Sequence, residues 1–163
     1  MALSAADQKV LDNIGEHGWS CMHVGEGRSG EPNFSYSIGW WAAAQAPECI
    51  VFGLPKNLQH SMLWEVYRQV SAGLKLADGL RVRDLIEGFD CVVRPVHETQ
   101  MPEYLGFAGW YRHRQLGSAE GLKAFQIFWP GKQQRLFPWE QDCNEDVRRW
   151  QPLLYLPLGV AAA

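Results

Sequence analysis

The sequence predicts an α+β fold in which a mostly antiparallel sheet carries helices packed on one face. Segments with helical and with strand-like periodicity follow one another, and their order departs from the regular alternation of a βαβ chain. No repeat, linker or low-complexity tract interrupts the 163 residues. We therefore expect a single domain spanning residues 1–163.

The N-terminal part of the chain predicts one helix followed by two strands. Ser4, with Asp7 three positions later, has the pattern of a helix cap, and Gly18 marks the end of that helix. Residues 19–24 have the composition of a strand. Residues 34–39 alternate large apolar side chains with Ser and Gly, which is typical of a strand with one buried face.

The middle of the chain predicts a buried strand and then the clearest helix. Residues 49–54 form a continuous apolar run with the length of a strand. The helix opens at Pro55 with Asn57 as its N-cap, carries an apolar stripe on one side, and ends at Gly73. A short helix is expected around residues 82–86.

The C-terminal half predicts two strands separated by a helix. Residues 89–97 form the first strand, and Pro95, which has no N–H to donate, indicates an edge position or a bulge. A helix over residues 102–116 and a strand over residues 125–129 follow. The apolar tail, residues 153–160, is expected to form a strand or a docked segment.

Charge and cysteine usage exclude several classes of function. The chain has 15 Lys and Arg against 18 Asp and Glu, and it lacks the basic footprint that phosphate backbones require, so we expect no general nucleic-acid binding. The four cysteines are at least 28 positions apart, which rules out a C-x-x-C zinc or redox pair. We expect reduced, buried thiols, except for Cys143, whose polar surroundings predict exposure.

The N-terminus and the motifs predict a cytoplasmic protein with no membrane span, metal or cofactor. Residues 1–7 lack the basic and apolar parts of a secretory signal, and no window of 18 residues is continuously apolar. Spacings typical of metal ligands and the Walker A pattern of phosphate-binding loops are missing. Residues 25–30 match G-x-G-x-x-G, but a strand follows where a dinucleotide site needs a helix, so the match favours a plain loop.

Two segments carry a more specific pattern. Residues 34–39, Phe-Ser-Tyr-Ser-Ile-Gly, are followed by residues 47–54, Pro-Glu-Cys-Ile-Val-Phe-Gly-Leu. They resemble the hallmark of the bacterial family catalogued as domain of unknown function 4262, in which an aromatic residue and Tyr-Thr-Ile-Gly precede Pro-Glu and a strand ending Phe-Gly-Leu. Further matches are Gln126, Trp129-Pro130, Phe137-Pro138-Trp139 and Gln151-Pro152.

The resemblance covers about Val10 to Pro152 and departs from the family's pattern at three positions. Ser37 stands where Thr is usual, Trp40 where Leu is usual, and Gly131 where an Asp commonly follows Trp-Pro. A reaction that depended on that Asp in relatives would lack it here. The resemblance implies a cytoplasmic bacterial protein and brings no activity with it.

His60 is the most informative histidine, and with Glu48 and Tyr36 it forms the candidate catalytic set. Counted from an N-cap at Asn57, His60 lies in the first turn of its helix, where the dipole favours a neutral imidazole that can act as a base or a ligand. Tyr36 and Glu48 approach each other if their strands pair, although the register is open. The alternative is that His60 only caps or packs locally.

A second candidate site uses aromatic residues at the ends of predicted elements. Trp129 and Trp139 flank a basic turn that contains Arg135, and such rings suit both ligand pockets and protein interfaces. Together with Arg94 they form the expected ligand- or partner-binding surface. The alternative is that the rings complete the core.

Two main functional interpretations follow. The first is a non-enzymatic binding or interaction module that recognises a protein partner or a small-molecule ligand through an aromatic-rich, exposed apolar surface. The second is a small enzyme with an aromatic pocket centred on His60, which requires its candidate residues to share one cleft. A flavin-binding, barrel-like module is a third interpretation, which rests only on the abundance of short apolar strands.

Overall fold

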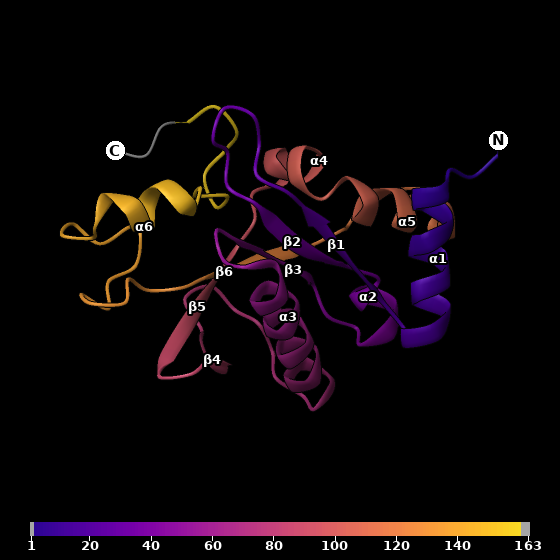
Figure 1. Ribbon diagram of the computed structural model, residues 1–163. Coiled ribbons are helices and arrows are strands. Elements are labelled where there is room, and N and C mark those ends of the chain that lie inside the picture. The colour runs from indigo at the N-terminus through magenta and orange to yellow at the C-terminus, as the bar shows by residue number, and fades with distance from the viewer. Residues whose placement is uncertain (1, 161–163) are drawn as a thin grey trace.

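Six strands form one open sheet in the computed structural model, which describes residues 2–160 (Figure 1). Their order across the sheet is β1-β2-β3-β6-β5-β4, and neighbouring strands are antiparallel except for β3 and β6. This architecture confirms the predicted α+β fold with a mostly antiparallel sheet. The strands are β1 (Ser20–Val24), β2 (Phe34–Ile38), β3 (Glu48–Phe52), β4 (Arg81–Ile86), β5 (Phe89–Pro95) and β6 (Ala124–Phe128).

Helices cover both faces of this sheet. In Figure 1, α3 lies below the sheet, whereas α4 and α5 lie above it. Val51 packs with Met62 of α3 in one core cluster, and Ile50 packs with Ala108 of α5 and Val10 of α1 in the other. The helices are α1 (Ala5–His17), α2 (Trp40–Ala43), α3 (Lys56–Ser71), the 3-10 helix η1 (Glu98–Gln100), α4 (Met101–Tyr104), α5 (Gly106–Leu116) and α6 (Glu145–Trp150).

Coverage of both faces corrects the expectation that the helices pack on one face. β3 is buried along its whole length, because its alternate side chains meet helices on opposite sides of the sheet. A continuous apolar run such as residues 49–54 is the usual sign of a strand buried on both faces. The serines of β2 are buried as well, since Ser35 is 1% and Ser37 0% exposed.

The helix starts agree with the sequence at α1 and differ at α3. Ser4 Oγ accepts a hydrogen bond from the backbone N–H of Asp7, and the Asp7 carboxylate accepts one from the N–H of Ser4, so the predicted cap forms. The N-cap of α3 is Pro55, not Asn57, and no side chain caps this end. His60 therefore lies in the second turn of α3 rather than in its first.

Residues 82–86 belong to β4, whereas the sequence predicts a short helix there. The pairing of β4 with β5 shifts its register between Val82 and Ile86. Val82 and Leu85 are consequently the buried residues of this segment, three positions apart, which is also the spacing of one helix face. The irregular strand thus imitates helical periodicity in the sequence.

Two further predictions in the C-terminal half are corrected. The helix expected over residues 102–116 is divided into α4 and α5 at Leu105, whose ψ of 43° leaves the helical region. Cys143 is buried, with 6% exposure, and not exposed as expected. Its side chain turns inward between exposed neighbours, and its Sγ lies 3.8 Å from the carbonyl oxygen of Leu136.

Pro95 and the C-terminal tail take positions that the sequence allowed. Pro95 ends β5, and the pairing with β4 extends only to Val92, so its missing N–H interrupts no bond between these strands. The tail is docked and forms no strand within the described part of the chain. The N–H of Leu154 donates to Gln126 Oε1 at 3.0 Å, and the carbonyl of Leu154 accepts from the N–H of His97 at 2.7 Å.

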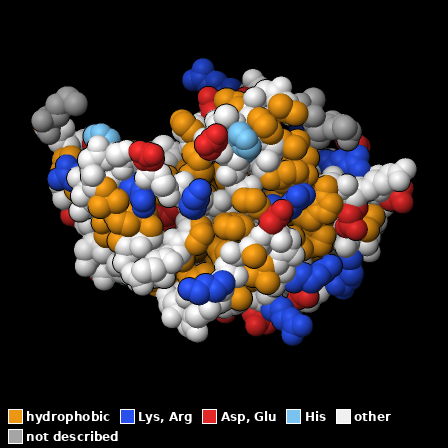
Figure 2. Space-filling model, turned by 180° about the vertical axis from the view of Figure 1, so that it is seen from behind, with side chains coloured by type: hydrophobic (Ala, Val, Ile, Leu, Met, Phe, Trp, Pro, Cys, Tyr) orange, Lys and Arg blue, Asp and Glu red, His pale blue; other side chains and the backbone are white. Residues whose placement is uncertain are grey.

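The face of the molecule shown in Figure 2 combines apolar and charged side chains. On the face shown in Figure 2, Lys and Arg are interspersed with Asp and Glu around apolar side chains. Among residues 2–160, the large hydrophobic side chains that are strongly exposed are Val24, Leu116, Leu158 and Val160. No helix in the same range is both long and apolar enough to cross a bilayer.

Candidate functional site

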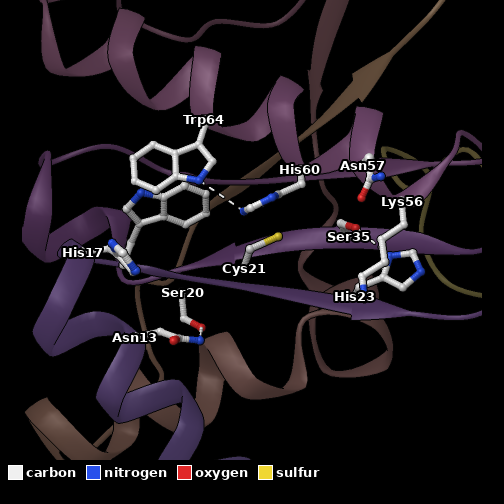
Figure 3. Close-up of a pocket in the computed structure, with 11 residues that line it drawn as sticks. Asn13, His17, Ser20, Cys21, His23, Ser35, Lys56, Asn57, His60 and Trp64 are labelled. Atoms are coloured by element: carbon white, nitrogen blue, oxygen red, sulfur yellow. Dashed lines mark hydrogen bonds between the residues drawn. The ribbon is translucent and has the colours of Figure 1, made fainter.

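A cleft of about 370 Å³ lies between α3 and the edge strand β1 (Figure 3). We call it the α3–β1 cleft. Three histidines from three elements line it: His17 of α1, His23 of β1 and His60 of α3. The cleft thus contains His60, the histidine that the sequence singles out, together with His17 and His23, which the sequence does not connect to it.

The strand register aligns the polar floor of the cleft. His23 of β1 stands opposite Ser35 of β2, so both side chains point to the same face of the sheet. That face is the one covered by α3, and Gln59, fully buried on the inner side of this helix, reaches Ser35. Three polar residues from three elements therefore meet beneath the cleft.

Hydrogen bonds fix the direction of this polar chain. The Gln59 amide nitrogen donates to the carbonyl of Asn33 at 3.5 Å, which leaves Gln59 Oε1 to accept the hydroxyl proton of Ser35 at 2.6 Å. Because that proton is used, the contact of 2.8 Å between Ser35 Oγ and His23 Nδ1 requires His23 to be the donor. His23 Nε2 is therefore the unprotonated ring nitrogen, and within residues 2–160 it has no hydrogen-bond partner.

The electrostatics of the cleft favour this state of His23. Burial lowers the pKa of His23 below its ordinary value of 6.5, and the charge of Lys56 lowers it further. Side-chain hydrogen bonding with Gln59 acts in the opposite direction and raises this pKa. The ring is consequently neutral near neutral pH and offers a hydrogen-bond acceptor.

Flat rings form the wall of the cleft beside α3. The indole N–H of Trp64 donates to His60 Nε2 at 3.1 Å, the interaction drawn as a dashed line in Figure 3. The neutral His60 ring then carries its proton on Nδ1 and can act as a donor. Trp64 packs edge-on against Trp19, with ring centres 4.9 Å apart, and His17 meets Trp64 edge-on at 6.2 Å.

Cys21 contributes an unreactive thiol to the floor of the cleft. Burial raises the pKa of Cys21 to about 11, although the charge of Lys56 opposes this effect. The side chain is therefore a protonated thiol at neutral pH and behaves as a small apolar group. Within residues 2–160, no three His, Cys, Asp or Glu side chains are grouped so that they could hold a metal ion.

Tyr36 lies outside this cleft. The alternation of β2 sends Tyr36 to the face opposite Ser35, where it joins the core cluster of α1 and α5. Its hydroxyl oxygen accepts the N–H of Phe107 at 3.1 Å, and burial raises the pKa of Tyr36 to about 12. The structure therefore does not bring Tyr36 and His60 into one cavity.

Glu48 also lies outside the cleft, in a fully buried hydrogen-bond network. Its Oε1 accepts from the hydroxyl of Ser37 at 2.7 Å and from the N–H of Trp40 at 3.1 Å, and its Oε2 accepts from the N–H of Gly39 at 2.6 Å. Burial raises the pKa of Glu48 to about 7, although these three hydrogen bonds and the charge of Arg112 act to lower it. The carboxylate joins the start of α2 to β3.

Arg94 and Trp139, from the expected aromatic surface, do lie together. The Arg94 guanidinium lies 3.8 Å from the ring centre of Tyr155 and 5.1 Å from that of Trp139. Its Nε donates to Asp78 at 3.0 Å. Arg94 and Trp139 line a pocket of about 420 Å³, but the Arg94 cation is already paired with Asp78 and stacked on aromatic rings.

Trp129 and Arg135 do not line that pocket, and each donates a hydrogen bond to a backbone carbonyl elsewhere in the fold. The Trp129 indole N–H donates to the carbonyl of Phe52 at 2.7 Å. Arg135 donates to the carbonyl of Gly88 at 2.9 Å, and its guanidinium lies 4.6 Å from the ring centre of Phe89. The four residues expected to form one recognition surface are thus divided among separate contacts.

A larger cleft of about 1010 Å³, which we call the C-terminal cleft, lies between α6, α4 and the tail. Trp139 and Tyr104 line it together with the tail. Sequence reasoning missed this cleft because it missed α6. The signal was present, since Asn144 followed by Glu145 and Asp146 has the pattern of a helix start, and the Asn144 side chain indeed accepts the N–H of Asp146.

The polar floor of the α3–β1 cleft was missed for a different reason. His23 and Ser35 stand on separate strands, and only the β1–β2 register shows that they face each other. Gln59 precedes His60 on the predicted helix, and its burial depends on which face of the sheet α3 covers. Sequence periodicity identifies neither relationship.

A family model described as Domain of unknown function (DUF4262) matches residues 13–144, which is most of the chain. The chain belongs to this DUF4262 family. The match confirms the resemblance carried by residues 34–39 and 47–54. Neither the curated proteins nor the solved structures contain a match to the chain.

Residues that carry the DUF4262 resemblance pack and connect the fold. Gly39, with φ of 104°, and Glu48 form the junction described above. A Cβ on Gly53 would stand 2.6 Å from the last carbonyl oxygen of α6, so only glycine fits where the tail of β3 passes that helix. Gln151 exchanges two hydrogen bonds with the backbone of Trp129, at 3.0 and 2.8 Å. The DUF4262 pattern therefore maps largely onto structural contacts.

Proposed function

We propose that this DUF4262 chain is a binding module, and that the α3–β1 cleft takes a small ligand with a flat ring. The observation that carries the proposal is the chain of hydrogen bonds that runs from the buried Gln59 and Ser35 to the partly buried His23. Burying polar groups such as Gln59 and Ser35 is unfavourable unless they form hydrogen bonds, and this chain satisfies them while presenting a free acceptor at His23 Nε2. The arrangement is that of a pre-formed recognition site.

The wall and size of the cleft support a flat, small ligand. Trp64 and His60 are held together by a hydrogen bond, and a fixed aromatic surface binds a planar ring without losing much conformational entropy. The volume of about 370 Å³ lies at the small end of the range of ligand pockets, which is about 300–1,000 Å³.

The protonation states in the cleft favour binding over catalysis. Ser35 donates its hydroxyl proton to an amide oxygen of Gln59, which cannot act as a base, so Ser35 is not an activated nucleophile. Cys21 is held as a thiol by its raised pKa of about 11. An enzyme centred on His60 has weaker support, because Tyr36 and Glu48 lie elsewhere.

Nuclear magnetic resonance with neutral flat-ring compounds tests this proposal. Indole and benzamide are titrated into isotope-labelled protein, and the side-chain signals of Trp64 and His23 are followed. We expect both signals to shift, and the shifts to be lost in Trp64→Leu but kept in Trp139→Leu, a matched change in the C-terminal cleft. Shifts confined to Trp139, or no shifts at the α3–β1 cleft, would overturn the proposal.

A further inference from the structure

We infer that the ligand of the α3–β1 cleft carries an anionic group, which binds beside Lys56 at the start of α3. This inference rests on the proposed function and adds the chemical class of the ligand. The anionic group is a carboxylate or a phosphate attached to the flat ring.

The charge of the cleft is one-sided. Lys56 and three histidines line it, whereas no Asp or Glu is among its lining residues, although the chain contains 18 acidic residues. Within residues 2–160, Lys56 forms no ion pair. A cation that faces a cleft without a counter-ion attracts an anionic ligand to that cleft.

Lys56 directs its charge toward the floor of the cleft and not only toward solvent. Figure 3 shows its side chain running from the start of α3 toward His23. After burial, the charge of Lys56 is the next cause that lowers the pKa of His23, and it also acts on Cys21 of the same strand. The ammonium group is therefore close enough to meet a ligand that rests on β1.

The start of α3 adds hydrogen-bond donors beside the positive charge of Lys56. Lys56 is the first residue of α3, a helix of 16 residues whose start has no side-chain cap, so the first backbone N–H groups are left for another acceptor. The neutral His60 ring carries its proton on Nδ1, because Nε2 already accepts from Trp64. The α3 side of the cleft thus offers donors, while His23 offers an acceptor on the β1 side.

An anion beside Lys56 has a measurable effect on His23. It offsets the field of Lys56, so the pKa of His23 rises when the ligand binds. The titratable groups lining the cleft around this ring are Lys56 and His60 of α3, Cys21 of β1 and His17 of α1. Of these, Lys56 is the one whose charge shifts the pKa of His23 in the unbound protein. Replacing Lys56 by Gln should therefore raise the pKa of His23 without any ligand.

The test compares benzoate with benzamide, which has the same ring and shape but no charge. Dissociation constants are measured by nuclear magnetic resonance on the full chain at neutral pH, together with the pKa of His23. We expect benzoate to bind about tenfold more tightly than benzamide, because a hydrogen bond to a charged group is the stronger one. The preference should fall to about one in Lys56→Gln and remain in Lys75→Gln, a control at an exposed lysine beyond α3.

Phenyl phosphate distinguishes the two sources of charge. Tighter binding of phenyl phosphate than of benzoate identifies a phosphate ligand, and the reverse order identifies a carboxylate. Either order supports an anionic ligand, provided that binding raises the pKa of His23.

The outcomes separate this inference from the proposed function. Equal binding of benzoate and benzamide in the cleft would overturn the inference and leave the binding module intact. A preference for benzoate that persists in Lys56→Gln would overturn the inference as well, because a group other than Lys56 would then bind the carboxylate. If no ring compound reaches the cleft, the proposed function itself fails.

Discussion

Glu48 makes the stability of the fold depend on pH in a direction opposite to that of most carboxylates. Burial raises its pKa from an ordinary 4.5 to about 7, so the folded chain holds the proton more tightly than the unfolded chain. Between these two values unfolding releases a proton, and the free energy of unfolding therefore falls as pH rises. The contribution is fully present below pH 4.5 and is lost above about pH 7.

The size of this effect follows from the two pKa values. One pH unit corresponds to about 1.4 kcal/mol for a single proton, so the interval from 4.5 to about 7 corresponds to about 3 kcal/mol. That is a large share of the stability of a typical domain, which is about 5–15 kcal/mol.

Urea unfolding of the wild type and of Glu48→Gln between pH 4.5 and 8 isolates this contribution. Glutamine does not titrate, so the difference between the two curves cancels the other ionisable groups. Its amide nitrogen faces N–H or hydroxyl donors, which costs about 1–3 kcal/mol at low pH. We expect the advantage of the wild type to shrink by about 3 kcal/mol as pH rises to 7.5.

A second variant tests the cause, and one result would refute the reasoning. Ser37→Ala removes a hydrogen bond that lowers the pKa of Glu48, so the pH window should move upward. If the wild-type and Glu48→Gln stabilities remain parallel across the whole range, Glu48 does not change its proton affinity on folding, and the argument fails.

Three further predictions concern packing and thiol reactivity. Gly53→Ala should destabilise the fold by about 2 kcal/mol more than Gly73→Ala in urea unfolding, because both glycines have positive φ but only the first Cβ meets α6. Trp129→Phe should cost about 1–2 kcal/mol more than Trp139→Phe, since only Trp129 satisfies a carbonyl of β3; equal losses would contradict this. Alkylation of Cys21 by iodoacetamide, followed by mass spectrometry, should stay slow at pH 8 and accelerate toward pH 11; rapid labelling at pH 8 would show a thiolate.

Local signals in the sequence predicted the elements that depend on local chemistry. The cap at Ser4, the apolar run at residues 49–54 and the stripe of α3 each act within one element, and the structure reproduces them. The prediction of a helix over residues 82–86 was wrong because the shift of strand register there depends on the partner strand. The periodicity of one segment carries no information about its partner. The prediction that helices cover only one face of the sheet was wrong because the alternating serines of β2 suggested a face exposed to solvent.

The sequence predicted that His60 lies at a candidate site, but it did not predict which residues of the neighbouring strands share the same face of the sheet. His60 does line a cleft, as its position on a helix beside a strand end indicated. Its expected partners, Tyr36 and Glu48, belong to other surroundings because α3 covers the face that carries Ser35. Choosing between neighbouring residues of β2 requires knowing which helix packs on which face, and no single segment encodes that.

The residues that hold the fold together are largely different from those at the rim of the α3–β1 cleft. Glu48 and Gly53 are surrounded by backbone groups, so their replacement acts on folding. Lys56 and His60 are exposed at the rim of the cleft, so under the proposed function we expect their replacement to change binding at nearly constant stability. Ser35 is the exception, because it is buried within the fold and also contacts His23. The shape of the α3–β1 cleft therefore depends on packing contacts of the fold, whereas under the proposed function its ligand preference depends on exposed groups at its rim.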